Sequence, residues 1–228
     1  MLISIIIPTY NQPKMLTQCL LSLNNQIDSN FEVIVSDDGS SLASRQEIES
    51  STSTLNYPFT YLWQADEGFR AAKARNEGIK KAKGDYIIFT DGDCILPPHF
   101  VSNHRKLAKK QYFVDGNRVL INRDFSEKIQ QKKQAFKVTG RTLTQYYRQK
   151  KINKILSGFT FPIGPLRYLS PKRWRGVKTC NLGVWKQDLL KINGFDENFT
   201  GWGHEDADLV IRLIRQKIKR KSGKYACV

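Results

Sequence analysis

Short apolar runs alternate with segments of helical spacing through the first third of the chain. Runs rich in β-branched and aromatic residues predict buried strands near residues 3–7, 31–35, 59–63 and 86–89. A helix is predicted after Pro13, where apolar residues recur at i, i+3, i+4 and i+7. A second helix is predicted over 71–81, whereas residues 50–54, rich in serine and threonine, are interpreted as a loop.

This order of elements predicts an α/β fold with a Rossmann-like, mostly parallel central sheet flanked by helices. Polar motifs follow the predicted strands directly: Pro8-Thr9-Tyr10-Asn11, Asp37-Asp38-Gly39-Ser40 and Asp91-Gly92-Asp93. Ligands bind beyond the carboxyl ends of strands in such sheets. We therefore expect these three motifs to gather at one edge of the sheet.

Positive charge is concentrated in the middle of the chain. The formal net charge is +16, and 19 lysines and arginines lie between Arg105 and Arg175 against only three acidic residues. Helical basic segments are predicted near 99–110, 126–137 and 141–156, and a loop over 157–177. A polyanion is the expected partner: nucleic acid, an anionic membrane surface or a phosphorylated glycolipid.

The cysteines and the apolar runs limit the class of protein further. Four scattered cysteines have no zinc spacing and predict no disulfide framework, which favours a reducing cytosol. We find no apolar run long enough to cross a bilayer and no signal-peptide pattern. The expectation is therefore neither an integral membrane protein nor a secreted one.

Paired carboxylates are the first candidates for chemistry. Asp91 and Asp93, one residue apart after a strand, can share a hard divalent cation and through it a diphosphate. Asp38 can accept a hydrogen bond from the N3–H of a uracil or from a ribose hydroxyl. Both motifs also suit simple turns. Arg75 is either a solvated cation or a partner for phosphate or a base edge.

The segment 201–206 is the second candidate. Its glycines, including Gly203, allow close backbone approach, and Trp202 offers a flat face of the kind on which sugars stack. Asp206 is a candidate general base, with Glu205 ordering the substrate. The alternative is that both acids only cap the positive end of a helix.

That helix is predicted over 204–216, with acidic residues in its first turn. The three histidines have no regular ligand spacing. His99 and His104 are interpreted as surface residues. His204 either contacts a substrate or lies in the core or on the surface.

A resemblance rests on several of these motifs together: Pro8-Thr9-Tyr10-Asn11, Asp37-Asp38-Gly39-Ser40, Ala74-Arg75-Asn76-Glu77-Gly78, Gly84-Asp85-Tyr86-Ile87, Asp91-Gly92-Asp93 and residues 201–206. The set resembles family 2 glycosyltransferases with the GT-A fold. Residues 191–208 are also similar to the C-terminal half of the β-1,4-galactosyltransferase and chondroitin-polymerase type. The resemblance covers about 1–100 and 179–216, and the basic middle lies outside it.

The resemblance implies a UDP-sugar donor and a Mn²⁺ or Mg²⁺ ion. It implies that Asp93 binds the metal and that Asp91 faces the ribose or the metal. It also implies that Asp206 is the base of an inverting, single-displacement reaction, while Trp202 and Gly203 are expected on the acceptor side. The residues it assigns to the nucleotide-sugar are Pro8, Thr9, Tyr10, Asp38, Arg75, Asp91 and Gly92.

A single GT-A domain over 1–228 is expected, in three parts. Residues 1–100 form the nucleotide-sugar half, 101–178 a basic helical insert and 179–228 the acceptor and catalytic half. Relatives often add a metal-binding histidine from a later strand. Residues 223–228 are interpreted as the start of such a strand, with no histidine after it. Either the chain is truncated there, or the metal takes water or another residue.

The expected acceptor is a glycan or lipid-linked glycan of bacterial surface polysaccharide or lipopolysaccharide synthesis. The expected location is cytoplasmic, peripheral on the inner face of the plasma membrane, with the basic segment on anionic lipid. The alternatives are a nucleic-acid-binding protein, a nucleotidyltransferase and a non-catalytic glycan-binding module. We expect no nucleic-acid partner, because the basic segment carries no recognisable nucleic-acid-binding motif.

Overall fold

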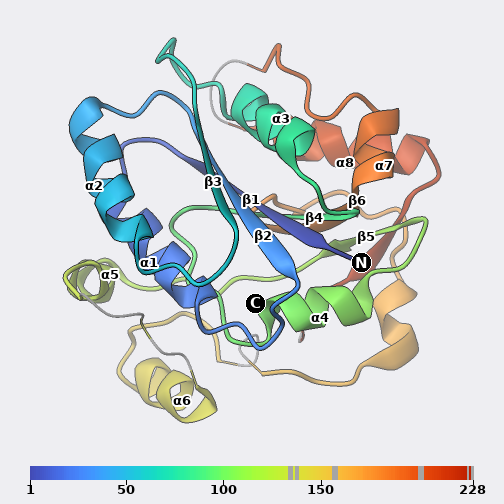
Figure 1. Ribbon diagram of the computed structural model, residues 1–228. Helices are drawn as coiled ribbons and strands as arrows, with labels where there is room; N and C mark the ends of the chain where they lie inside the picture. The colour runs from blue at the N-terminus through green and yellow to red at the C-terminus, as the bar shows by residue number, and fades with distance from the viewer. Residues whose placement is uncertain (133–135, 137–138, 156–158, 200–202, 225, 227–228) are drawn as a thin grey trace.

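The computed structural model is a seven-stranded sheet with helices on both faces (Figure 1). It describes residues 1–132, 136, 139–155, 159–199, 203–224 and 226. The strands are β1 (Ile3–Thr9), β2 (Phe31–Asp37), β3 (Phe59–Trp63), β4 (Tyr86–Thr90), β5 (Tyr112–Asp115), β6 (Asn181–Trp185) and β7 (Lys219–Ser222). The helices are α1 (Pro13–Leu23), α2 (Leu42–Thr52), α3 (Ala71–Lys81), α4 (Phe100–Leu107), α5 (Arg123–Gln130), α6 (Gly140–Arg148), α7 (Lys186–Lys191) and α8 (Glu205–Arg215), with a 3₁₀ helix over Gly164–Tyr168.

The strand order is β3-β2-β1-β4-β6-β5-β7. Strand β6 runs antiparallel to both of its neighbours, β4 and β5, and the other pairs are parallel. Ile3 of β1 pairs with Phe31 of β2 on one side and with Tyr86 of β4 on the other. The three strands therefore start level and end at the same edge, which confirms the predicted α/β fold with a mostly parallel sheet.

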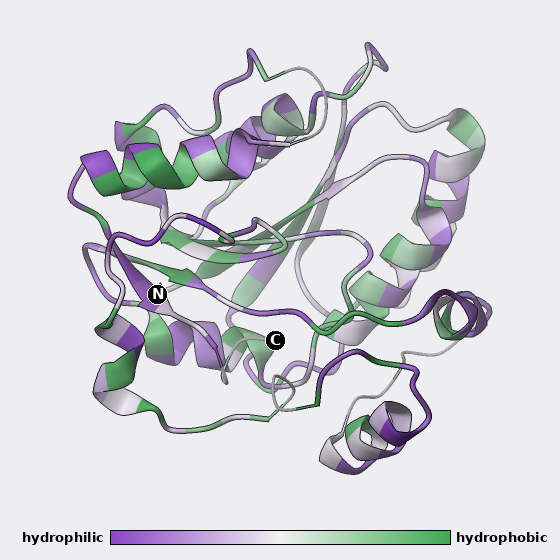
Figure 2. Cartoon of the chain, turned by 180° about the vertical axis from the view of Figure 1, so that it is seen from behind, coloured by the Kyte–Doolittle hydropathy of each residue, from purple (hydrophilic) through white to green (hydrophobic). Residues whose placement is uncertain are grey.

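Two hydrophobic cores lie on opposite faces of the sheet. Ile6 points to the face that α3, α7 and α8 cover, whereas its neighbours Ile5 and Ile7 point to the face of α1, α2 and α4. Figure 2 shows the apolar residues along the strands at the centre of the molecule. Because both faces are covered, β1 and β2 read as nearly continuous apolar runs instead of alternating ones.

Residues 50–52 lie in α2, so the predicted loop over 50–54 was wrong in its first part. The helix begins after Ser41, whose side chain accepts a hydrogen bond from the Ser44 amide. Ile48 is the only buried residue of α2. The sequence of this helix therefore shows no apolar periodicity from which it could be predicted.

Strand β7, at one edge of the sheet, has a sequence that is not typical of a strand. Strand β7 has the sequence Lys-Arg-Lys-Ser, yet Arg220 is buried and forms an ion pair with Asp115 of β5 at 2.8 Å. The expectation that a strand starts at residue 223 was wrong, and residues 225, 227 and 228 of that segment lie outside the described residues. Strand β7 ends at Ser222, and the described residues after it lie outside any strand.

The basic stretch over 101–178 is only partly a helical insert. Strand β5 within it belongs to the central sheet. Helix α5 begins earlier than the predicted 126–137, and α6 ends well before residue 156. In the part of the chain that is described, no helix combines the length and apolarity needed to cross a membrane.

Candidate active site

The ends of β1, β2 and β4 meet at one edge of the sheet. The Asp38 amide donates a hydrogen bond to the Thr9 carbonyl at 2.9 Å, which ties the end of β2 to the end of β1. A Cβ on Gly92 would lie 3.3 Å from the Pro8 carbonyl oxygen and 3.7 Å from Thr9 Oγ1. The structure thus brings the three polar motifs together as expected.

Asp38 lies buried at this edge. Its carboxylate accepts hydrogen bonds from Gln64 Nε2 and from the Arg70 amide, both at 2.6 Å. Burial raises the pKa of Asp38 despite these hydrogen bonds. Tyr10 is half exposed, and its hydroxyl donates to Asp66 at 2.9 Å. Asp38 and Tyr10 therefore line the same edge, one buried and one exposed.

Asp37, next to Asp38, has a different role. Its Oδ1 accepts hydrogen bonds from the Gly39 and Ser40 amides, and its Oδ2 accepts one from the Tyr61 hydroxyl. These contacts hold the turn after β2, so the turn interpretation applies to Asp37. Asp38, in contrast, lies at the edge of the sheet where β1, β2 and β4 end.

Asp91 and Asp93 follow β4 at the same edge. About a third of the Asp91 side chain is exposed, and Asp93 is exposed. Burial is the main cause that raises the pKa of Asp91, Arg75 lowers it, and the negative charges of Asp93 and Asp206 raise it further. The carboxylates of Asp91, Asp93 and Asp206 therefore lie within electrostatic reach of one another.

The pair Asp91 and Asp93 fits a divalent cation that a substrate also binds. Among the described residues, no group of three or more His, Cys, Asp or Glu side chains is placed to hold a metal ion. Mg²⁺-like cations, however, are usually held by one or two carboxylates together with substrate phosphates. The mutual repulsion of these carboxylates is what such a cation would relieve.

Arg75 is buried between two carboxylates. Its guanidinium lies 3.6 Å from Asp91 and 3.6 Å from Glu205, and it lies over the Phe195 ring at 5.4 Å. Within the described chain, Arg75 Nε and Nη1 and Glu205 Oε2 are buried without a hydrogen-bond partner. Buried polar atoms are normally paired. The cluster thus has hydrogen-bonding capacity to offer a ligand.

Asp206 is held in a fixed orientation at the start of α8. Its Oδ2 accepts a hydrogen bond from the Thr179 amide at 3.0 Å, and its Oδ1 accepts one from the Thr179 hydroxyl at 2.7 Å. Each carboxylate oxygen can accept a further hydrogen bond. Asp206 therefore has the free lone pairs that a proton acceptor needs.

The residues expected on the acceptor side lie just before α8. Gly203 has φ +104°, a conformation that favours glycine, and a Cβ there would meet open space. His204 follows with φ 72° and is exposed. Trp202, the residue expected to stack on a sugar, lies outside the described residues.

His99 is exposed as predicted, but the interpretation of His104 as a surface residue was wrong. His104 is fully buried against the Phe100 ring, and its Nε2 lies 2.9 Å from Asn181 Oδ1. Burial lowers the pKa of His104 to about 4. It supports α4 against β6 and lies in the protein core.

Two residues that support the site, Asn76 and Thr179, were not among the predicted site residues. Asn76 donates to the Phe195 carbonyl at 2.9 Å and accepts from the Phe195 amide at 2.8 Å, which fixes the loop beneath Arg75. Asn76 lies within the 74–78 motif, so the sequence already indicated that this segment is important. Thr179 had no such indication, because a lone threonine after a basic loop is unremarkable.

Two protein-family models match the chain. A model described as glycosyl transferase family 2 matches residues 4–170, and one described as the N-terminal domain of galactosyltransferase matches 167–225. The validoxylamine A glucosyltransferase of Streptomyces hygroscopicus subsp. jinggangensis is 29% identical, covering 93% of this chain and 51% of that protein. The chondroitin synthase of Escherichia coli is 30% identical, covering 94% and 32%. The chain thus spans about half or less of these relatives.

Solved structures share the fold. Residues 1–349 of S. aureus TarS in complex with UDP-GlcNAc align with a TM-score of 0.65 and 20% identity, covering 97% of this chain and 56% of that one. The mannosyltransferase PcManGT from Pyrobaculum calidifontis, in complex with GDP-Man and Mn²⁺, aligns with a TM-score of 0.63 and 17% identity, covering 96% and 54%. With the family model matching most of its length, the chain belongs to family 2 of the glycosyltransferases.

Proposed function

We propose that the protein moves a sugar from a UDP-sugar to a hydroxyl of a glycan or glycolipid acceptor in an inverting reaction that depends on Mn²⁺ or Mg²⁺. The observation that carries the proposal is Asp206, which Thr179 orients and which lies within electrostatic reach of Asp91. A base and a diphosphate-binding pair are what such a transfer requires.

Asp206 would act on the acceptor. Its carboxylate takes the proton from the acceptor hydroxyl while that oxygen forms a bond to the anomeric carbon of the sugar. The bond from this carbon to the diphosphate oxygen breaks at the same time, on the opposite side, and UDP leaves with its electron pair. The two hydrogen bonds from Thr179 keep the carboxylate pointed in one direction throughout.

Arg75 and Glu205 would bind and orient the donor. Among the described residues, two nitrogen atoms of the buried guanidinium have no hydrogen-bond partner, and they lie beside Asp91, where the diphosphate is expected. Glu205 Oε2 has no hydrogen-bond partner within the described part of the chain, which suits a hydroxyl of the bound sugar. Asp38, with Pro8, Thr9 and Tyr10 beside it on the strand edge, would hold the nucleoside.

Asp91 and Asp93 would hold the divalent cation, and Gly92 between them lets this segment lie close to the Pro8 carbonyl at the end of β1. When bound, a divalent cation neutralises the charge that develops on the departing diphosphate.

The basic segment would bring the enzyme to its acceptor. We place the protein in the cytoplasm, on the inner face of a bacterial plasma membrane, where lipid-linked precursors of surface polysaccharide or lipopolysaccharide are built. The exposed Arg141 and Arg148 of α6, a helix with no acidic residue, support this, because each cation near an anionic surface contributes about 1 kcal/mol. Co-sedimentation with vesicles tests it: binding to anionic lipid at low salt, weaker at high salt, is expected. Equal, weak binding to anionic and zwitterionic vesicles would remove the membrane role.

A screen of UDP-sugars for UDP release tests the enzymatic function. We expect release with at least one sugar in Mn²⁺ or Mg²⁺, and none after chelation. Asp93→Asn is the test variant, and the exposed Asp124→Asn on α5 is its matched control. Absence of release with every donor, together with no UDP binding by calorimetry, would contradict the proposal.

A further inference from the structure

A cavity of about 570 Å³ lies beside the candidate active site. One wall is the segment after β4 and helix α4, with Ile95 and Phe100, and the other wall is formed by α5 and α6. In Figure 2 these two helices stand apart from the sheet, joined to it by long connections. The volume is in the range of about 300–1,000 Å³ that is typical of small-molecule pockets.

The outer wall is apolar and well packed. Phe125 of α5 lies 4.7 Å from the Tyr146 ring of α6, and Phe136 lies 5.6 Å from both rings. Ile129 and Leu143 complete this wall. The aromatic rings thus hold α5 and α6 together while one side faces the cavity.

Two charged residues in the lining connect the cavity to the candidate active site. Asp93, of the pair that follows β4, lines the cavity, and so does Arg118. Arg118 also lies close enough to Asp91 to lower the pKa of that carboxyl. In the described chain, the Arg118 guanidinium has no hydrogen bond or ion pair. It is a cation available to an anionic ligand at the junction of the two sites.

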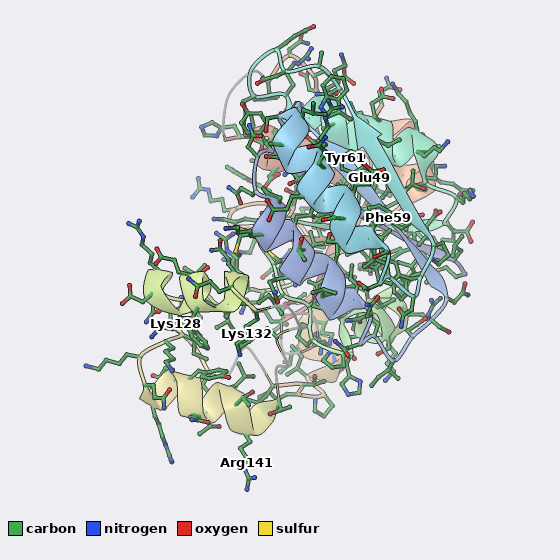
Figure 3. All side chains as sticks on the ribbon, turned by 60° about the vertical axis from the view of Figure 1, so that its left-hand side comes forward. Glu49, Phe59, Tyr61, Lys128, Lys132 and Arg141 are labelled. Carbon is green, nitrogen blue, oxygen red and sulfur yellow. The ribbon has the colours of Figure 1, made fainter. Side chains whose placement is uncertain are left out.

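Further positive charge lies beside the aromatic rings of the outer wall, outside the lining of the cavity. Lys151 Nζ lies 4.8 Å from the centre of the Phe125 ring, and Lys132 Nζ lies 5.3 Å from that of Phe136. Figure 3 shows Lys132 in the region of α5 and α6, together with the exposed Lys128 and Arg141. An apolar cavity with Arg118 in its lining, and with further cations beside the aromatic rings of its outer wall, suits an amphipathic anion.

We propose that this cavity binds the apolar arm of an acceptor whose sugar is attached to that arm through a phosphate group. The arm lies between the segment after β4 and the two helices, and the phosphate pairs with Arg118. The acceptor sugar then reaches past Asp93 toward Asp206. This inference rests on the proposed function, because it names the class of acceptor that the same active site would use.

Binding of short alkyl phosphates to the wild-type chain tests the cavity without any reaction. Each buried methylene tightens binding by about fourfold, so octyl phosphate should bind at least about tenfold more tightly than butyl phosphate. This comparison needs no variant. Equal affinities for the two chain lengths would overturn the apolar assignment.

Variants then locate the site. Leu143→Trp fills the cavity and should weaken octyl phosphate at least about tenfold while leaving inorganic phosphate unchanged. The matched control is Gln145→Trp, on the exposed face of the same helix, which should bind octyl phosphate like the wild type. Arg118→Gln should weaken octyl phosphate about tenfold but leave uncharged octyl glucoside unchanged. Wild-type affinity in L143W would overturn the location, and wild-type affinity in R118Q would overturn the role of the cation.

Titration of UDP in the presence of Mn²⁺ separates this inference from the proposed function. A wild-type chain that binds octyl phosphate with the expected chain-length dependence but no UDP would leave the cavity assigned and remove the donor site. A chain that binds UDP but shows no chain-length dependence would keep the donor site and remove the cavity's role.

Discussion

Thr179 donates two hydrogen bonds to Asp206, one from its amide at 3.0 Å and one from its hydroxyl at 2.7 Å. The threonine precedes β6, and the aspartate lies in the first turn of α8. The contact therefore joins the antiparallel strand of the sheet to the helix that carries the candidate base. It fixes the carboxylate beside the ends of the parallel strands.

Thr179→Val removes the hydroxyl and keeps the shape of the side chain. We expect kcat to fall about tenfold, on the order of 1.5 kcal/mol, with the KM for the donor unchanged. The reason is that Asp206 loses one of the contacts that orient it, whereas the donor site is untouched. Steady-state kinetics checks this, with Thr179→Ser as the control that should keep most of the activity. A rise in donor KM with kcat unchanged would contradict the orienting role.

Asp93→Asn tests the metal pair. Activity should fall by about a hundredfold or more, on the order of 3 kcal/mol of barrier, while the fold remains intact. The amide keeps the size of the side chain but cannot supply the negative charge that a divalent cation needs. Activity is measured together with the circular dichroism spectrum. Near-normal activity, or a wild-type enzyme indifferent to chelator, would show that these carboxylates serve another purpose.

Arg75→Met should destabilise the protein by about 3 kcal/mol, because it leaves Glu205 buried without its cation. The double variant Arg75→Met/Glu205→Gln removes the uncompensated charge and should recover part of that loss. Urea unfolding measures both. Additive losses in the double variant would mean that the two side chains are not coupled.

His104 makes stability depend on pH. Its folded-state pKa of about 4 lies below the ordinary value of 6.5, so the unfolded chain takes up a proton first as the pH falls. Stability is therefore fully present above 6.5 and is lost toward pH 4. Between pH 7.5 and 5 the loss from this residue is about 2 kcal/mol. His104→Gln should lose correspondingly less over that interval, and the exposed His99→Gln should behave like the wild type. Equal losses in H104Q and the wild type would assign the pH dependence to other groups.

The sheet and the strand-end motifs could be predicted because their causes are local. Each parallel strand is buried on both faces, so it appears as an apolar run, and each ends in a polar turn. Asp38, Asp91 and Asp93 follow from that rule without knowledge of the tertiary structure. The acidic start of α8 was visible for the same reason, since helix starts favour negative charge.

What could not be predicted depends on tertiary contacts. Arg220 reads as a solvated residue until Asp115 of a neighbouring strand pairs with it in the sheet. From the sequence alone His104 is interpreted as a surface residue, because its buried contact with Asn181 depends on the tertiary structure. Thr179 gains its role only from the approach of Asp206, 27 residues later in the chain. Each of these partners is distant in sequence and leaves no pattern around the residue.

The most direct test of the central claim pairs donor binding with transfer in Asp206→Asn. A base acts on the acceptor hydroxyl and not on donor affinity. We predict that D206N binds UDP-sugar in Mn²⁺ as tightly as the wild type by calorimetry and keeps its fold, yet shows no transfer to acceptor. Transfer at the wild-type rate, or loss of donor binding along with the fold, would contradict the assignment of Asp206 as the base.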